Sequence, residues 1–219
     1  MASQPASMRR DRERDLVRAT RALFDERGMQ DAPIEEIARA VGIARGLIYR
    51  HFSSKEELYV LTVTEYLSEL EALLRKASSP ELEPVAQLEA WAHAYVGFCL
   101  RYPAFLDCAL SLMRRPADEL RDQVSEAVWL RLGLGMAACL GPLAEILAAG
   151  ARAGIFAVDD PDATANRLYA QTLGTMHLAR IGVGVRPAGP GLASAFPLDA
   201  REIRDACVRD ALAAVGAPG

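Results

Sequence analysis

The sequence lacks the features that mark several other classes of protein. Its 219 residues include four cysteines, none in C-x-x-C spacing, and three histidines, none at i, i+4 from each other or from a cysteine. No apolar run approaches the roughly 18–20 residues of a membrane span. A G-x-S-x-G elbow and a phosphate-binding glycine loop are also missing. We therefore predict no bound metal, no cofactor, no catalytic residue and no membrane partner.

The cysteines and the N-terminus suggest a cellular compartment. Cys99, Cys108, Cys139 and Cys207 each have apolar neighbours, which is typical of buried, reduced thiols. A redox sensor is the alternative interpretation. No apolar signal-peptide core follows the small, polar first residues. We therefore expect a cytoplasmic protein.

The net charge of −4 is divided unevenly along the chain. Residues 1–60 hold eleven Lys or Arg and ten Asp or Glu, so this segment is +1 and the remainder is −5. A near-neutral head on an acidic body is typical of a protein that contacts DNA through one small face.

Apolar residues recur with helical spacing in almost every segment, which predicts an all-α protein. Four helices are expected in the head, where Gly28 and Gly42 mark two ends. Ser53 and Glu56 have capping-box spacing before the fourth. The expected head helices are residues 16–27, Ile34–Val41, Arg45–His51 and Ser53–Lys76.

The remaining sequence predicts a helical body. Asp160-Pro161 has the pattern of an N-cap followed by a first-turn proline. Gly182–Pro197 is rich in Gly and Pro without periodicity, which predicts a flexible loop and no strand. The expected body helices are Pro84–Arg101, Ala104–Arg114, Ala117–Ala153 with a kink at Pro142, Asp160–Ile181 and Asp199–Val215.

Two short helices joined by a glycine turn carry the functional signal. Ala38 is small where a second helix must cross, and Gly42 permits the turn. Ile43 and Ile48 are expected to fill the joint below. Such a unit places its second helix in the DNA major groove. The sequence thus predicts a helix-turn-helix with its recognition helix at Arg45–His51.

The motif resembles the tetracycline-repressor (TetR) family of transcriptional regulators over about residues 12–60. This resemblance implies a three-helix DNA-binding domain followed by a helical ligand-binding and dimerisation domain. The expected divisions are residues 1–10 as a flexible tail, 11–58 as the DNA-binding domain and 59–219 as the body. The resemblance is carried by Leu23-Phe24, Gly28, Ile34-Glu35-Glu36-Ile37-Ala38, Val41-Gly42-Ile43, Gly46-Leu47-Ile48-Tyr49-Arg50-His51-Phe52 and Lys55-Glu56-Glu57-Leu58.

The resemblance implies roles for the exposed side of the recognition helix. The Tyr49 hydroxyl suits a phosphate oxygen, and Lys55 offers a cation in the first turn of its helix. The guanidinium of Arg45 suits a guanine edge, with a solvated or phosphate-bound arginine as the alternative. His51 either donates to a phosphate or caps and packs. The predicted DNA-binding residues are Arg45, Gly46, Leu47, Tyr49, Arg50, His51 and Lys55.

Two features near this site depart from the family pattern. A hydroxyl residue is common at the start of the second helix and before the recognition helix, but this chain has Ala32-Pro33 and Ala44. Two phosphate contacts or caps are therefore missing. The basic run Arg9–Arg14 either compensates as a DNA-contacting arm or is a solvated tail.

Aromatic residues with polar tips concentrate in the body. Most such side chains form core, but the resemblance implies an effector pocket, and an amphipathic pocket uses these residue types. The candidate ligand-binding residues are Trp91, Tyr95, Phe98, Met113, Trp129, Met136, Tyr169 and His177.

The last two predicted helices carry small residues on their apolar faces, which permits close helix approach. By resemblance, we expect a homodimer through these helices, bound to palindromic double-stranded operator DNA. We further expect a repressor released by a small hydrophobic or aromatic effector. The alternatives are an activator of the same family, or a helical interaction module without sequence-specific DNA binding. The small faces are formed by Ala165, Leu168, Thr172 and Met176, and by Ile203, Cys207 and Ala211.

Overall fold

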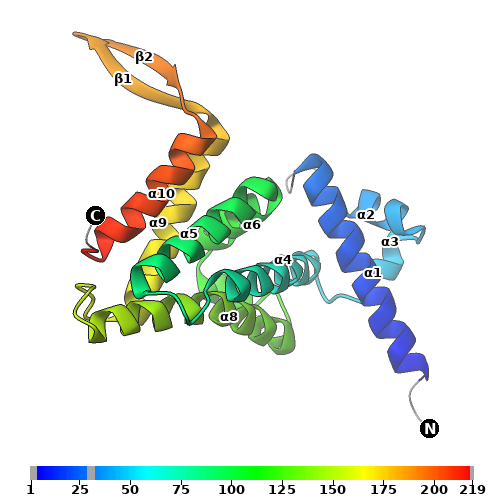
Figure 1. Ribbon diagram of the computed structural model, residues 1–219. Coiled ribbons are helices and arrows are strands. Elements are labelled where there is room, and N and C mark those ends of the chain that lie inside the picture. Colours follow the sequence, from blue (N-terminus) through cyan, green and yellow to red (C-terminus); the bar gives the residue numbers. More distant parts are fainter. Residues whose placement is uncertain (1–3, 29–32, 218–219) are drawn as a thin grey trace. The chain divides into compact units, whose positions relative to one another are not determined.

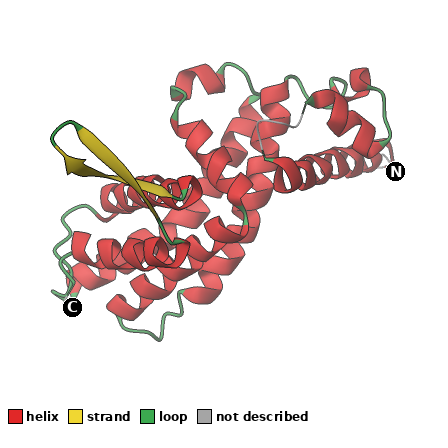
Figure 2. Cartoon of the chain, turned by 90° about the horizontal axis from the view of Figure 1, so that it is seen from above, coloured by secondary structure: helices red, strands yellow, loops and turns green. Residues whose placement is uncertain are grey.

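The computed structural model describes residues 4–28 and 33–217, and most of them are helical (Figure 1). The all-α prediction is confirmed, with one two-stranded hairpin as the exception (Figure 2). The elements are α1 Gln4–Arg27, α2 Ile34–Val41, α3 Arg45–Ile48, α4 Lys55–Ala77, α5 Pro84–Arg101, α6 Pro103–Met113, α7 Ala117–Arg121, α8 Glu126–Arg152, α9 Pro161–Ile181, β1 Val183–Gly189, β2 Leu192–Pro197 and α10 Ala200–Ala214.

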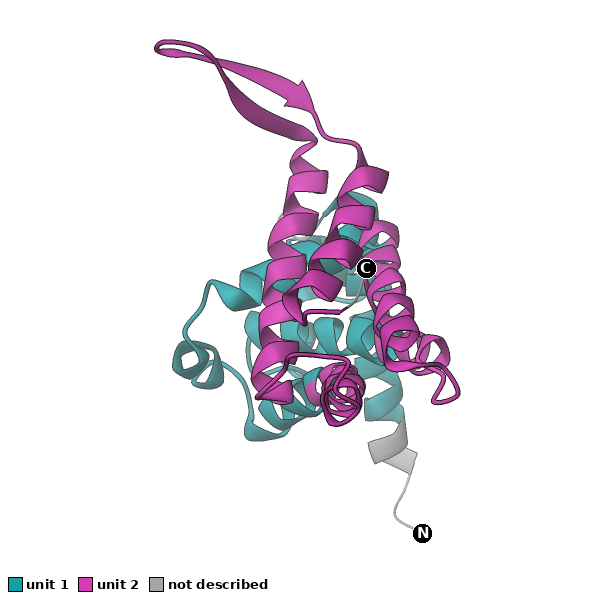
Figure 3. Ribbon diagram, turned by 60° about the vertical axis from the view of Figure 1, so that its left-hand side comes forward, with its two compact units in different colours: residues 1–69, 102–136 teal, residues 70–101, 137–219 magenta. Residues whose placement is uncertain are grey.

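Contacts divide the chain into two compact units (Figure 3). Unit 1 comprises residues 1–69 and 102–136, and unit 2 comprises residues 70–101 and 137–219. The division passes through α4 and α8, so each of these helices contributes to both units. The limits expected from the sequence, at residues 10 and 58, separate a tail, a DNA-binding domain and a body by their expected roles. These limits stay predictions.

Helix α1 is longer than the sequence predicted. Residues 4–10 were expected in a flexible tail, but they form its first turns. Ion pairs one turn apart support the extension, because Arg9 Nε lies 3.0 Å from Glu13 Oε1 and Arg14 pairs with Asp11. The helix ends at Gly28, whose φ of +84° confirms the predicted C-cap glycine.

The start of α4 differs by one residue from the predicted capping box. Ser54, rather than Ser53, is the cap, and its Oγ accepts a hydrogen bond from the Glu57 amide at 2.9 Å. The Glu57 carboxylate accepts from the Ser53 amide at 2.5 Å. Only one half of the capping box is therefore formed by Ser54 and Glu57, because the carboxylate accepts from the residue before the cap.

The predicted long helix Ala117–Ala153 is two helices, α7 and α8. Residues 122–125 form a turn between them, in which the Val128 amide donates to the Ser125 carbonyl at 3.0 Å. Ser125 also donates its hydroxyl to Glu57, which fixes the turn against α4. Pro142 lies inside α8, and no break in the helix is assigned there.

The prediction that no apolar run approaches the length of a membrane span was wrong for α8. By length and composition it is able to cross a membrane, with a mean hydropathy of 1.7 in its most apolar window. Helices α5 and α6, which are bent by 102° relative to each other, also have the length and composition of a span when they are taken together. Core helices meet the same criterion, so composition does not by itself make either one a span.

The segment Gly182–Pro197, predicted to be a flexible loop, contains the antiparallel hairpin β1–β2. Val183 pairs with Pro197 and Pro187 with Ala193, and a register shift follows before Gly189 pairs with Leu192. Pro190-Gly191 forms the two-residue loop, and Gly191 has a φ of +71°. The prediction was wrong because abundant Gly and Pro hid a Pro-Gly turn between two short extended segments.

All four cysteines are free and buried, which confirms the structural interpretation of these residues. Burial raises the pKa of the Cys99, Cys108 and Cys139 thiols to about 12 and that of Cys207 to about 11. Thiolates are therefore scarce at neutral pH, which disfavours the redox-sensor alternative.

Candidate nucleic-acid interface and effector site

The turn between α2 and α3 follows from Gly42, whose φ of +70° lies in the left-handed region. The next amide, of Ile43, donates to the Ala38 carbonyl at 2.9 Å and closes the helix end. Ala38 is 3% exposed and Ile48 is fully buried, whereas Ile43 is half-buried. The predicted helix-turn-helix geometry is therefore present in unit 1.

The recognition helix is shorter than predicted. Only Arg45–Ile48 is α-helical, and a hydrogen-bonded turn continues to Phe52, whose amide donates to the Ile48 carbonyl at 3.0 Å. Ile48 and Phe52 face the core of unit 1 and hold this turn in place. Most of the predicted DNA-binding side chains lie on the opposite, exposed side: Arg45, Gly46, Leu47, Tyr49, Arg50 and Lys55.

Arg45 interacts with two side chains, and the sequence motif predicts neither interaction. Its Nη1 lies 2.6 Å from Glu35 Oε1 on α2, and the Tyr49 side chain is close enough to interact with it electrostatically. The interactions with Tyr49 and with the Glu35 carboxylate raise the pKa of Arg45 above its ordinary value. Glu35 thus competes with any guanine edge for the guanidinium.

His51 differs from its neighbours because its side chain is only 20% exposed. Its Nδ1 is buried and lies 3.9 Å from Glu13 Oε1 on α1, too far for a hydrogen bond. The ring contacts Phe52 with a centroid distance of 6.4 Å. This placement favours the packing role for His51, and a phosphate contact stays a prediction.

The two departures in capping appear in the structure as far as it describes them. Pro33 and Ala44 occupy the N-cap positions of α2 and α3, and neither makes a side-chain cap hydrogen bond. Ala32 lies outside the described residues. Backbone amides at both helix starts therefore lack the side-chain hydroxyl common in the family pattern.

A buried polar cluster links the head to the segment that follows α7. Glu57 is 7% exposed, and its carboxylate accepts hydrogen bonds from the Ser53 amide and the Ser125 hydroxyl. The Ser54 hydroxyl donates to the Gln123 carbonyl at 2.6 Å. Burial opposes the charge, but the hydrogen bonds from Ser125 and Ser53 prevail and lower the pKa of Glu57 below its ordinary value.

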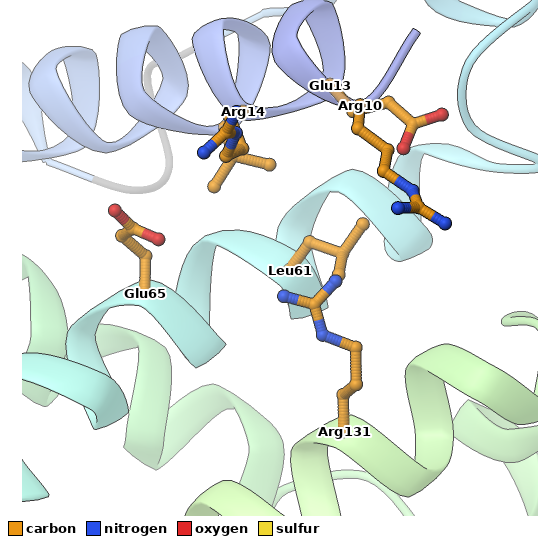
Figure 4. Close-up of a pocket in the computed structure, with 7 residues that line it drawn as sticks. Arg10, Glu13, Arg14, Leu61, Glu65 and Arg131 are labelled. Atoms are coloured by element: carbon orange, nitrogen blue, oxygen red, sulfur yellow. The ribbon is translucent and has the colours of Figure 1, made fainter. Parts of the chain in front are cut away.

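A charged hollow of about 440 Å³ lies beside α1 and α4 in unit 1. Figure 4 shows Arg131 and Arg10 extending into the space around Leu61. Arg14 also lines this hollow, so two arginines of the predicted basic arm lie against their own unit. Contact of that arm with DNA stays a prediction. The lining is Arg10, Glu13, Arg14, Val17, Leu61, Glu65 and Arg131.

The candidate effector residues divide between the two units. Trp91 stacks on Tyr95 at a centroid distance of 5.2 Å, and Tyr95 meets Tyr169 edge-on at 6.2 Å, all in unit 2. Phe98 is buried there on α5 and His177 is half-buried on α9. The other three belong to unit 1: Met113, which is half-exposed, and Trp129 and Met136, which are half-buried.

Within the candidate effector residues of unit 2, three polar atoms are buried without a hydrogen-bond partner among the described residues. They are Trp91 Nε1, Tyr95 Oη and His177 Nδ1. Burial raises the pKa of Tyr95, so its hydroxyl stays protonated and able to donate. Buried polar groups normally have partners, so these atoms mark a place where a ligand or water would gain hydrogen bonds.

The helices predicted to form the dimer pack first within their own protomer. Both α9 and α10 contact each other and α5. The small residues expected at the dimer interface are therefore buried inside unit 2, which corrects that part of the prediction. The buried residues are Ala165, Leu168, Thr172, Met176, Ile203, Cys207 and Ala211.

Residues 16–61, from α1 to the first turns of α4, match the family model for bacterial regulatory proteins of the tetR family. Over this segment the chain is therefore similar to the DNA-binding part of that family. The resemblance inferred from the motif is thereby confirmed, and the matched segment contains the complete α2–turn–α3 unit.

The curated relatives are transcription regulators rather than enzymes. The chain is 31% identical over 90 residues to the HTH-type transcriptional activator FasR of Mycolicibacterium smegmatis, covering 41% of each chain. It is 35% identical over 82 residues to the repressor KstR2 of the same species, covering 36% of this chain and 38% of that one. Each match therefore spans well under half of the relative.

The likeness of fold extends over nearly the whole chain. The crystal structure of RolR in complex with its ligand resorcinol superposes with a TM-score of 0.67. It covers 97% of this chain and 91% of RolR at 17% identity. The chain thus shares the fold of RolR, and at this identity the likeness concerns fold alone.

Proposed function

We propose that the protein is a DNA-binding transcriptional regulator whose α2–turn–α3 unit contacts operator DNA. The observation that carries this proposal is the exposed face of α3 and the start of α4. Four side chains are exposed there, while Ile48 is buried on the other side of α3. The exposed residues are Arg45, Tyr49, Arg50 and Lys55. Cations and a hydroxyl on a short rigid helix match phosphate and base-edge chemistry in the major groove.

DNA affinity as a function of salt tests this proposal. Binding to genomic fragments is expected to weaken steeply with salt, because phosphate contacts release counterions. The double variant Tyr49→Phe/Lys55→Ala should bind more weakly at all sequences, with a salt slope lower by about one for the lost lysine. A wild type that binds no fragment would instead support a helical interaction module.

We further propose that the regulator acts as a homodimer through α9 and α10, as usual for its family. Since the small faces are buried, the outer sides remain available, including Leu178 at 44% and Ile181 at 53% exposure. A two-fold dimer would place two recognition helices about 34–36 Å apart, one DNA turn, on a palindromic site. Sedimentation at micromolar concentration is expected to give a dimer.

A small hydrophobic or aromatic effector is proposed to bind in unit 2 and to lower operator affinity. The buried Trp91–Tyr95–Tyr169 cluster supports an aromatic ligand, and the three unpartnered polar atoms support one with hydrogen-bonding groups. RolR, of like fold, was crystallised with resorcinol. Binding would shift the equilibrium between DNA-competent and incompetent states.

A thermal-shift screen of phenolic and other aromatic compounds tests the effector proposal. A true effector should raise the melting temperature of the wild type and reduce DNA affinity. Tyr95→Phe retains the ring but loses the hydroxyl. It should therefore lower the affinity for compounds that form a hydrogen bond with that hydroxyl. Repression in the cytoplasm is the proposed mode, and a reporter gene whose expression falls when the protein is absent would indicate activation instead.

A further inference from the structure

The hairpin β1–β2 has one face built only of apolar side chains. Residues directly opposite in an antiparallel pair point to the same side, and side chains alternate along each strand. The register therefore collects the apolar side chains on one face, which is exposed: Val183, Val185, Pro187, Ala193, Ala195 and Pro197. Of the two valines on this face, Val185 is the more exposed, at 73%.

The opposite face of the hairpin is partly covered by its own side chains. The Phe196 ring lies over Gly184, where any side chain on residue 184 would collide with the ring at 2.4 Å. The Arg186 guanidinium lies 5.7 Å from the centre of the same ring, and its Nε donates to Ser194 Oγ at 3.4 Å. The two faces thus differ: one is self-covered and polar, and the other is uncovered and apolar.

The hairpin is attached firmly to the two helices that we propose form the dimer. Its strands continue from α9 and lead into α10, and the Leu198 amide donates to the Gly182 carbonyl at 3.0 Å across the base. Figure 1 shows it projecting beyond the ends of both helices. An isolated two-stranded hairpin is marginal in water, so an exposed apolar face gains stability when it is covered.

Apolar exposure is continuous from the helix into the hairpin. Leu178 and Ile181 on the last turns of α9 are exposed, and Val183 and Val185 follow directly on β1. Prolines at 187 and 197 lack an amide hydrogen, which limits extension of the sheet edges by another strand. The geometry therefore favours packing through the face over pairing through an edge.

We propose that this apolar hairpin face packs against a second copy of the chain and extends the dimer interface of α9 and α10. The proposal rests on the proposed dimer, because the hairpin continues the exposed side of its helices. In a two-fold assembly both protomers present the same hairpin face. The face therefore makes two symmetry-related contacts in the dimer.

Two neighbouring substitutions of the same charge test the proposal. Ala195→Glu places a carboxylate on the apolar face, and Ser194→Glu places one on the opposite face beside Arg186. We expect Ala195→Glu to raise the dimer dissociation constant at least about tenfold in sedimentation, which corresponds to about 1.4 kcal/mol. Ser194→Glu should change it less than threefold, and neither should alter the helical circular dichroism.

Equal dissociation constants for both variants in a dimeric wild type would overturn the hairpin proposal alone. A wild type that is monomeric at all concentrations would overturn the dimer as well. As a second readout, Ala195→Cys should be labelled more slowly by a maleimide as protein concentration rises, whereas Ser194→Cys should not. Protection only upon addition of phosphatidylglycerol vesicles would assign the face to a membrane and contradict the proposal.

Discussion

The α3 face and the hairpin face are both exposed, yet their chemistry is opposite. The α3 face presents Arg45, Tyr49 and Arg50 around one half-exposed leucine, whereas the hairpin face presents no polar side chain. Charged and hydroxyl groups lose little in water and gain contacts with phosphates. Apolar groups gain only when another apolar surface covers them. Exposure alone therefore does not define an interface, and its chemistry indicates the class of partner.

The largest expected effect is a loss of operator affinity when Arg45 is replaced. This substitution should affect the α3 face and leave the hairpin face unchanged. Arg45→Ala should weaken operator binding by about 1–3 kcal/mol and relax specificity at one base pair per half-site. The dimer dissociation constant should be unchanged, because Arg45 lies in unit 1, far in sequence from α9 and α10. Fluorescence anisotropy on the selected operator and its single-base variants measures both affinity and specificity. A uniform loss at every base would make Arg45 a phosphate contact.

The Glu57 cluster is expected to support unit 1 rather than either interface. Glu57→Gln should lower the free energy of unfolding by about 1–3 kcal/mol, since buried amide and hydroxyl donors lose a charged acceptor. Urea denaturation measures the loss. Glu56→Gln, in the same first turn of α4, is the control and should be nearly neutral.

The pH dependence of the same variant follows from the lowered pKa of Glu57. The stabilising contribution is complete above the pKa of the unfolded carboxyl, about 4.3, and is lost as pH falls through the lower folded pKa. The difference in stability between wild type and Glu57→Gln should therefore be largest near neutral pH and shrink below about pH 4. A difference that grows on acidification would contradict this assignment.

Two glycines of α8 allow the effect of close packing to be compared with the effect of helix propensity. A Cβ on Gly150 would lie 2.0 Å from the Phe156 ring, whereas a Cβ on Gly133 would meet no neighbouring element of the described structure within 4 Å. Gly150→Ala should cost about 1–3 kcal/mol by overpacking. Gly133→Ala should be neutral or stabilise by up to about 1 kcal/mol, because alanine favours the helix. Calorimetry on both variants checks this.

The smallest expected effect concerns the competition for Arg45. Glu35→Gln removes the carboxylate that holds the guanidinium in the free protein and also reduces negative charge beside DNA. Operator affinity should rise about two- to fivefold at low salt and approach that of the wild type at high salt. Glu36→Gln is the control, because Glu36 pairs with Arg27 instead. A weaker operator complex would mean that Glu35 orients Arg45 for binding.

The sequence was most informative where geometry demands a particular residue. Gly42 must tolerate a positive φ and Ala38 must be small, so the helix-turn-helix could be located to within a few residues. Asp160 likewise identified the start of α9, since its Oδ1 accepts from the Ala163 amide at 2.9 Å. Local rules of capping and turn conformation act within a few residues, and a sequence displays them directly.

Features set by contacts between distant residues could not be predicted in this way. Ser125 and Glu57 are 68 residues apart, and their hydrogen bond helps to separate α7 from α8. The small faces of α9 and α10 were assigned to a partner because sequence does not show that α5 covers them. The hairpin was missed because the pairing of Gly184 with Phe196 is invisible in a Gly- and Pro-rich segment.

Selection of bound fragments from a random DNA pool tests the central claim most directly. The account predicts an enriched palindrome with half-sites about one helical turn apart, near 10–10.5 base pairs between centres. Tyr49→Phe/Lys55→Ala should greatly reduce the recovery of that palindrome. Recovery of no common sequence by the wild type, or of the same palindrome with equal efficiency by the variant, would contradict the assignment of the α3 face to DNA.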